Sequence, residues 1–169
     1  MKQKRSKTPL QSILGMAPWN VWKGYGSFLF FDFGRKRRID KDTVAGQFVL
    51  EISMAHWVIQ QGRKEVAHSE SPDNKIIRSA KQFEGKRLLE ITLRKHHCPK
   101  RTLYSARFTF EDHWHLDVYM YETGKHDDMF AVLSASTLTT YDYTGELNTR
   151  RRPKQSSRRT VDPRRVNVR

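Results

Sequence analysis

The strongest fold signal in this chain is the stretch from residue 102 to residue 121, TLYSARFTFEDHWHLDVYMY. A loop at residues 111–113 would fold it into an antiparallel hairpin. In that register one face carries only apolar and aromatic side chains, in the facing pairs Phe110–Trp114, Phe108–Leu116, Ala106–Val118 and Tyr104–Met120. The other face places Arg107 opposite Asp117, and opposite charges stabilise such a pair. The stretch therefore predicts a hairpin that faces a hydrophobic core.

Further strands are predicted on both sides of this hairpin. Residues 27–34 are almost entirely apolar, which indicates a strand covered on both faces. Residues 47–60 alternate between the two faces and predict one long or bent strand. Between these two runs, residues 34–46 are expected to form a polar connection. The remaining strands are expected at residues 63–69, 86–95, 129–136 and 137–147.

One helix is well signalled, over residues 71–85. Ser71 stands at the cap position, Pro72 at the first helical position, and Gly85 at the stop. Its apolar stripe consists of Ile76, Ile77, Ala80 and Phe83. A shorter helical turn is expected within residues 9–16.

These elements predict an α+β fold within a single domain, residues 9–147. Its mostly antiparallel sheet would have about seven or eight strands, with one packed helix. Residues 1–8 and 148–169 have almost no bulky apolar side chains, so we expect them to be disordered basic tails.

Charge is the main functional signal. The 169 residues carry a net charge of +14, of which +4 lies in residues 1–8 and +8 in residues 148–169, so residues 9–147 carry only +2. Such a chain attracts polyanions such as nucleic acid. A further basic cluster interrupts the middle of the chain at residues 35–38.

The predicted interface is with the phosphate backbone of nucleic acid. Nine of the last twenty residues are Lys or Arg, and each guanidinium presents a two-pronged donor that fits phosphate. Contacts of this kind read no base edges, so binding is expected to be non-specific. Alternatively, the tail serves solubility or nuclear import. The candidate binding residues are Arg35, Lys36, Arg37, Arg38, Arg150, Arg151, Arg152, Lys154, Arg158, Arg159, Arg164 and Arg165.

Histidines give a second, weaker candidate site. His113, His115 and Asp117 share one face of the predicted hairpin, a spacing that can hold a metal ion. The simpler interpretation is a solvated hairpin face, because Asp117 already has Arg107 opposite. Residues 96–98, HHC, are interpreted as a polar loop.

An acidic residue also interrupts the apolar run at Asp32. A buried carboxylate needs partners, so Asp32 either caps the strand end, pairs with an arginine, or joins Asp40 and Glu51 in a metal-dependent nuclease site. The chain contains no phosphate-binding glycine loop, dinucleotide fingerprint, nucleophile elbow or zinc-protease signature. No cofactor and no catalytic residue is therefore expected.

Aromatic residues accompany cations near the start of the chain. Trp19, Trp22 and Tyr25 surround Lys23, a pattern that stacks nucleic-acid bases or, as we favour, belongs to the core. Cys98 is the sole cysteine, which excludes an intrachain disulfide and favours a reducing compartment. No apolar run approaches the roughly 20 residues that span a bilayer. A cytoplasmic location without a membrane partner is expected.

The order of motifs resembles that of small bacterial β-rich domains of unknown function, which are encoded near toxin–immunity or defence genes. The resemblance covers residues 24–145, with a departure at His56. The positions that carry it are Gly26, Ser27, Phe28, Asp32, Gly34 and Trp57. It implies a protein-binding role or a place in a defence complex, and it brings no catalytic residue with it.

Taken together, these signals predict a non-catalytic accessory subunit that binds nucleic acid through arginine-rich tails inside a larger assembly. Two alternatives remain open at this point. One is an immunity-type inhibitor that binds a protein partner through its folded sheet. The other is a metal-dependent nuclease.

Overall fold

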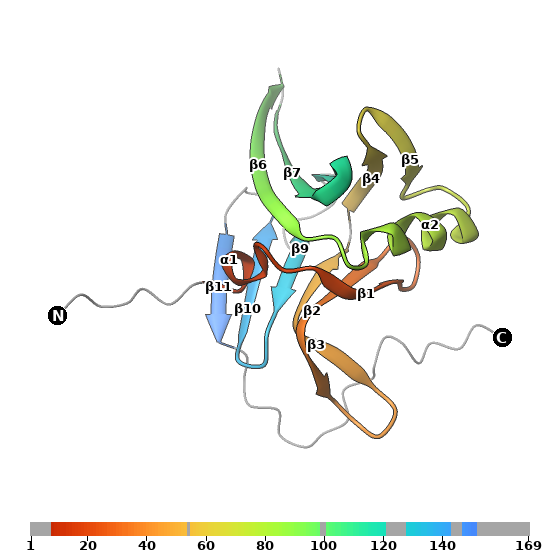
Figure 1. The fold of residues 1–169 in the computed structure, drawn as a ribbon. Helices are drawn as coiled ribbons and strands as arrows, with labels where there is room; N and C mark the ends of the chain where they lie inside the picture. Colours follow the sequence, from red (N-terminus) through yellow and green to blue (C-terminus); the bar gives the residue numbers. More distant parts are fainter. Residues whose placement is uncertain (1–7, 54, 99–100, 121–127, 143–146, 152–169) are drawn as a thin grey trace.

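In the computed structural model, residues 8–53, 55–98, 101–120, 128–142 and 147–151 are described. Within them the chain forms two antiparallel sheets and one main helix (Figure 1). The six-stranded sheet has the order β1 (Pro18–Lys23), β2 (Leu29–Arg38), β3 (Val44–Ile52), β9 (Asp128–Leu133), β10 (Thr137–Asp142) and β11 (Leu147–Arg151). The five-stranded sheet has the order β5 (Lys64–His68), β4 (Ala55–Gln61), β8 (Trp114–Met120), β7 (Arg101–Phe110) and β6 (Leu88–Cys98).

The β-rich architecture is confirmed, but the strands divide between two sheets instead of forming one sheet of seven or eight. The division falls inside the run 47–60, which was expected to be a single strand. Buried positions are Leu50 and Ile52 before residue 54, then Ala55 and Trp57 after it. This change of phase, from even to odd positions, carries the chain from β3 in one sheet to β4 in the other.

Two further differences concern the extent and number of the strands. Residues 34–46 are not a mere connection, because β2 continues to Arg38 and β3 begins at Val44. A further strand, β11, follows β10 and pairs with it. Residues 148–151 therefore belong to the sheet and not to a tail. The remaining tail residues, 1–7 and 152–169, lie outside the described residues.

The hairpin predicted from residues 102–121 is confirmed. β7 and β8 pair in the expected register, from Ser105 opposite Tyr119 to Thr109 opposite His115. The loop is a 3-10 turn, Glu111–His113, in which Asp112 and His113 adopt φ of 56° and 60°. Polar residues therefore take the left-handed positions where a glycine would have signalled the turn.

Helix α2 (Asp73–Ala80), followed by the 3-10 turn η1 (Lys81–Phe83), corresponds to the predicted helix. Two details of the prediction are wrong. The Ser71 hydroxyl accepts a hydrogen bond from the His68 N–H and caps nothing, and Pro72 is the N-cap. Ile77 is 47% exposed, although Ile76, Ala80 and Phe83 are buried as expected. The short helix α1 (Pro9–Ile13) begins with a capping box in which Thr8 and Gln11 bind each other's backbone N–H.

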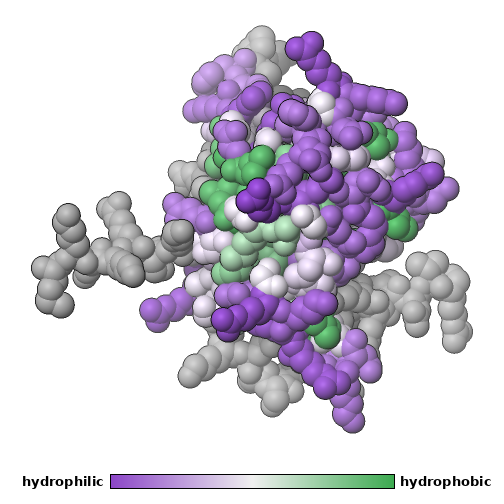
Figure 2. All heavy atoms as spheres, in the orientation of Figure 1, coloured by the Kyte–Doolittle hydropathy of each residue, from purple (hydrophilic) through white to green (hydrophobic). Residues whose placement is uncertain are grey.

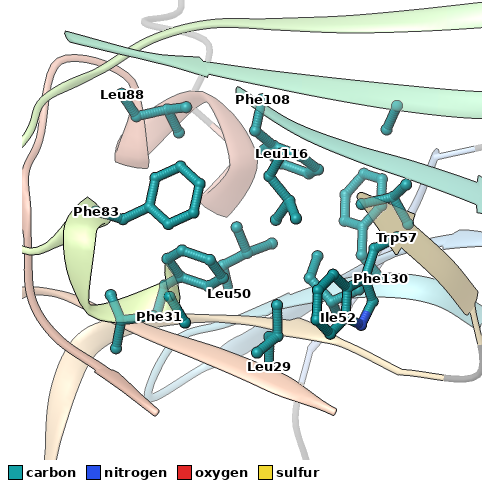
Figure 3. Close-up of a cluster of buried hydrophobic side chains, with 14 of the residues drawn as sticks. Leu29, Phe31, Leu50, Ile52, Trp57, Phe83, Leu88, Phe108, Leu116 and Phe130 are labelled. Carbon is teal, nitrogen blue, oxygen red and sulfur yellow. The ribbon is translucent and has the colours of Figure 1, made fainter. Parts of the chain in front are cut away.

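The hydrophobic core lies between the two sheets (Figure 3). Leu29, Phe31, Leu50, Ile52 and Phe130 come from the six-stranded sheet, and Trp57, Leu88, Phe108 and Leu116 from the five-stranded sheet. Phe83 enters from η1 and packs its ring 4.7 Å from that of Phe110. No helix in the described part of the chain is both long and apolar enough to cross a membrane.

Candidate nucleic-acid interface

The outer parts of β2 and β3 leave the six-stranded sheet as a two-stranded hairpin (Figure 1). The ladder between β1 and β2 ends at Phe33, and the ladder between β9 and β3 ends at Val49. Beyond these points the pairing of β2 with β3 continues, as Lys36 with Gly46 and Arg38 with Val44. We call residues 34–46 the basic ribbon. It carries Arg35, Lys36, Arg37, Arg38 and Lys41 against Asp40 and Asp42.

The base of the basic ribbon is a β-bulge that only glycine permits. The register of β2 against β3 shifts between Phe33 and Lys36, where Gly34 has a φ of 72°. Across from it, a Cβ on Gly46 would lie 2.6 Å from both Phe33 N and Phe48 O. The glycines therefore bring the two backbones into close contact and set the direction in which the ribbon leaves the sheet.

Asp32 fixes this base from inside the protein. Its side chain is 1% exposed, and the carboxylate accepts three hydrogen bonds. Oδ1 accepts from the Gly46 N–H at 2.8 Å, and Oδ2 accepts from Asn20 Nδ2 at 2.9 Å and Trp22 Nε1 at 3.3 Å. These partners are a side-chain amide, an indole and a backbone N–H, whereas an arginine was one of the alternatives considered from the sequence. Both carboxylate oxygens serve to hold β1, β2 and β3 together.

The proposed nuclease group of Asp32, Asp40 and Glu51 does not assemble. Asp40 lies near the far end of the ribbon, where its Oδ1 accepts a hydrogen bond from the Asp42 N–H at 2.9 Å. Glu51 lies on β3 opposite Phe30, deeper in the sheet. Among the residues that the structure describes, no three His, Cys, Asp or Glu side chains come together as a metal site requires.

Four of the five cations of the ribbon are exposed, and Arg37 is half-buried. Arg37 Nε donates to Gly46 O at 3.2 Å, and Arg38 Nη2 donates to Lys41 O at 2.8 Å. Within the described ranges, no salt bridge involves Arg35, Lys36, Arg37 or Arg38. Backbone carbonyls therefore position two of the guanidinium groups without neutralising their charge. Figure 2 shows hydrophilic side chains over this part of the molecule.

The aromatic residues beside the ribbon have different roles. Lys36 Nζ lies 4.8 Å from the centre of the Trp19 ring, a cation–π contact at the base of the ribbon. Trp22 stacks on Phe30 at 4.0 Å and donates to Asp32, so its role is structural, although it is half-buried and does not belong to the core cluster. Tyr25 is exposed instead and does not belong to the core.

Arg150 and Arg151 lie in β11, the edge strand of the same sheet on the side away from β1. Arg151 pairs with Thr137, next to the β9–β10 turn. Leu133, on the other side of that turn, pairs with Val49 of β3, close to where the ribbon begins. The two exposed arginines and the ribbon are therefore at the same end of the sheet, the lower end in Figure 1. The other predicted binding residues lie outside the described residues: Arg152, Lys154, Arg158, Arg159, Arg164 and Arg165.

At the candidate histidine site, Asp117 and His115 contact other side chains of the hairpin. Arg107 donates to Asp117 twice, from Nε at 2.6 Å and from Nη2 at 2.7 Å. His115 Nδ1 lies 3.3 Å from Thr109 Oγ1, and burial, aided by the charge of Arg107, lowers the pKa of its imidazole. His113 stands in the turn with its positive φ. These side chains form the polar face of the hairpin, with Arg107 opposite Asp117 as in the simpler interpretation, but the face is not fully solvated because Asp117 is 4% exposed.

Residues 96–98 also differ from the prediction. They are the last residues of β6 and not a loop. His96 Nε2 lies 2.9 Å from Ser105 Oγ of β7, so this imidazole is engaged across the two strands.

Sequence reasoning missed a group of titratable side chains on the outer face of the five-stranded sheet. His56 Nδ1 lies 2.6 Å from Ser69 Oγ, and the His56 ring is 6.3 Å from that of His68 and 6.2 Å from that of Tyr119. Burial raises the pKa of the Tyr119 phenol, with a further contribution from Asp117, so the phenol keeps its proton at neutral pH. The available signal was the change of phase after residue 54, which puts His56 on the face opposite Trp57.

Comparison with known proteins adds no assignment to this geometry. No model of a known protein family matches the chain, and no curated protein matches it. The resemblance to domains encoded near toxin–immunity genes stays a prediction. What the protein binds is therefore inferred from its own charges and shape.

Proposed function

We propose that this protein binds nucleic acid through the phosphate backbone, as a non-catalytic accessory subunit. The contact surface is the basic ribbon together with Arg150 and Arg151. The observation that carries the proposal is the concentration of five cations on a projecting two-stranded element whose base is fixed by Asp32. Guanidinium and ammonium groups held at one end of a sheet suit a row of phosphates, which are regularly spaced anions.

The binding is electrostatic and independent of sequence. If about five side chains reach phosphates of a DNA duplex, the logarithm of the association constant falls against the logarithm of salt concentration with a slope of about −4.5. The cations of residues 152–169 add to the attraction. In this arrangement the folded domain also contributes to binding, and the tail does not act alone.

The test compares two triple variants that lose the same charge. The ribbon variant is Arg35→Gln, Lys36→Gln and Arg38→Gln. The control variant is Arg63→Gln, Lys64→Gln and Lys75→Gln, three exposed positions in the β4–β5 turn, β5 and α2. Binding is measured by fluorescence anisotropy with a short labelled duplex at moderate salt.

We expect the ribbon variant to bind at least about tenfold more weakly and the control to change little, because of the two substituted sets only the ribbon cations lie on the proposed contact surface. Equal losses in the two variants would contradict the ribbon as the binding surface. An intact protein that binds no nucleic acid even at low salt would overturn the function itself and favour a protein partner.

A further inference from the structure

We infer that two copies of this protein associate through β6, edge to edge and antiparallel, about a two-fold axis at Thr92. The five-stranded sheets of the two copies then form one continuous sheet. This inference is independent of the proposed function. It rests on three features of β6: its outer edge, the symmetric placement of its charges, and the partly exposed apolar side chains on its core-facing side.

β6 is the longest of the four strands that form the edges of the two sheets. It has 11 residues, whereas β1 has 6 and β5 and β11 have 5 each. The outer edge of β1 is also covered, because Val21 N–H donates to Glu84 Oε1 at 2.7 Å and Gly85 N–H donates to Pro18 O at 2.9 Å. Short or covered edges resist pairing with another chain, so β6 is the edge best suited to it.

Within the described residues, the chain covers the start of the outer edge of β6. There Gly15 N–H donates to Leu88 O at 2.7 Å, and Leu88 N–H donates to Met16 O at 2.8 Å. From Glu90 to Cys98, β6 pairs with β7 in a regular register, and no described strand pairs with its other edge (Figure 1). A long edge of this kind can add another strand through backbone hydrogen bonds.

The charges of β6 are placed symmetrically about Thr92. Charged side chains on an edge strand ordinarily oppose pairing, and a row of one sign would repel its own copy. Here Glu90 stands two residues before Thr92 and Arg94 two residues after it. In an antiparallel pair centred on Thr92, Glu90 of each copy therefore lies opposite Arg94 of the other. The result is two opposite-charge pairs, which stabilise the association.

Both charged side chains are available for this pairing. Glu90 and Arg94 are exposed, and neither takes part in a salt bridge within the part of the chain that the structure describes. Thr92 Oγ1 donates to Glu90 Oε1 at 3.0 Å, so the Glu90 carboxylate is directed along the strand toward the axis.

The core-facing side of β6 carries apolar side chains that the core covers only in part. The register with β7 places Ile91 beside Phe108 and Leu93 beside Ala106, and these two β7 residues are buried. Ile91 and Leu93 pack against the core but are only half-buried. In the pair centred on Thr92, Ile91 of each copy lies opposite Leu93 of the other. Association therefore buries apolar surface across the two-fold axis.

The first experiment measures the molar mass of the full chain by sedimentation equilibrium over a range of concentrations, after nuclease treatment has removed nucleic acid. We expect the molar mass to rise with concentration from 20.0 kDa, the mass of one chain, to twice that value. The mass of one chain at every concentration up to the limit of solubility would overturn the inference and leave the proposed function standing.

The second experiment exchanges the charges. Glu90→Lys and Arg94→Glu each place like charges opposite one another in their own dimers, so we expect each variant to dimerise at least about tenfold more weakly. An equimolar mixture of the two variants restores both opposite-charge pairs, as does the double variant, so both should regain the dimer. Arg63→Glu, which makes the same charge change as Arg94→Glu at an exposed position in the β4–β5 turn, is the control and should dimerise normally.

Recovery in the mixture would show that the single variants are folded. Equal dimerisation of every variant would overturn β6 as the interface, and so would a loss that neither the mixture nor the double variant repairs.

The third experiment tests the position of the axis. A residue on a two-fold axis faces its own copy, and facing Cα atoms of antiparallel strands lie about 4.5–5.5 Å apart, within the range of a disulfide. In a Cys98→Ser background we expect Thr92→Cys to form a disulfide-linked dimer on mild oxidation, detected by non-reducing electrophoresis. Lys75→Cys, at an exposed position of α2, is the control and should remain largely unlinked. Equal linking of the two variants, or none in Thr92→Cys, would overturn the register.

Discussion

At the scale of single residues, Asp32 explains why a charge stands inside an apolar strand. The sequence could show that this buried carboxylate needs partners, because an unpaired charge in a core is costly. It could not show which partners, since Asn20 and Gly46 come from β1 and β3 and meet Asp32 only in the folded sheet. The buried charge marks the base of the ribbon.

Substitution of Asp32 by Asn tests this structural role. One carboxylate oxygen becomes an amino group that faces a donor, so a buried hydrogen bond is lost. We expect the free energy of unfolding to fall by about 2 kcal/mol, measured by urea denaturation followed by circular dichroism. Glu70→Gln, at an exposed position, is the control and should change stability by less than about 0.5 kcal/mol. Equal stabilities of the two variants would show that Asp32 is not an anchor.

His115 should make the stability depend on pH. Burial, aided by the charge of Arg107, lowers the pKa of His115 in the folded protein. At pH values around the ordinary pKa of histidine, the unfolded chain therefore binds more protons than the folded protein. Stability should therefore decrease as the pH falls below about 6.5, the ordinary pKa of histidine. We expect His115→Gln to reduce this decrease in urea titrations at a series of pH values. Identical pH profiles for His115→Gln and the unsubstituted protein would contradict the prediction.

At the scale of elements, local sequence patterns were sufficient to predict the β7–β8 hairpin and α2. The hairpin register follows from facing residues separated by a few positions along the chain, and the helix follows from its stripe and its Pro and Gly boundaries. The basic ribbon could not be recognised in this way. Beyond β1 and β9 it lies outside the sandwich, so it carries none of the apolar alternation that identifies a strand.

The Arg107–Asp117 pair should contribute strongly to the stability of the hairpin. Asp117 is 4% exposed, and Arg107→Met would remove both guanidinium hydrogen bonds from its carboxylate. We expect a loss of about 3 kcal/mol in guanidinium chloride denaturation, because a buried charge is left uncompensated. The double variant Arg107→Met with Asp117→Leu should recover part of this loss. A loss below about 0.5 kcal/mol in the single variant would class the pair with weak surface ion pairs.

Gly46 should be indispensable to the ribbon element. A Cβ there meets only backbone atoms, at 2.6 Å from Phe33 N and Phe48 O, so the bulge itself must move. We expect Gly46→Ala to destabilise the fold by at least about 2 kcal/mol and to weaken nucleic-acid binding, measured by thermal unfolding and anisotropy. Gly24→Ala is the matched control, since its close neighbour is a side-chain atom, Phe30 Cε2 at 2.7 Å, which can shift. Unchanged stability and binding in Gly46→Ala would show that the bulge is needed neither for the fold nor for binding.

At the scale of the whole molecule, sequence reasoning identified the chemistry of the candidate site but not its shape. Arg35–Arg38 and Arg150–Arg151 were recognisable as cations from the sequence alone. That they share one end of a sheet depends on the pairing of β3 with β9, β9 with β10, and β10 with β11. Such pairings join residues distant along the chain, so no local pattern encodes them. The division into two sheets escaped prediction because the phase change after residue 54 was taken for the continuation of one strand.

Two shortened chains distinguish the effect of the tail's charge on binding from the effect of strand β11 on stability. A chain that ends at residue 151 keeps β11 paired with β10 but lacks the seven cations of residues 152–169. We expect it to unfold at the same urea concentration as the full chain, with a shallower salt dependence of DNA binding, by up to about 6 in the logarithmic slope. It should still bind a DNA duplex at low salt, because the ribbon is intact.

A chain that ends at residue 146 also loses β11, which exposes the edge of β10, so it should unfold at lower urea concentration. Binding by the chain that ends at residue 151 distinguishes phosphate contacts made by the tail from those made by the folded domain. If the chain ending at residue 151 is as stable as the full chain yet binds no DNA at low salt, the phosphate contacts belong to the tail alone. If it still binds DNA at low salt, the folded end of the sheet makes phosphate contacts of its own and the tail only strengthens the attraction.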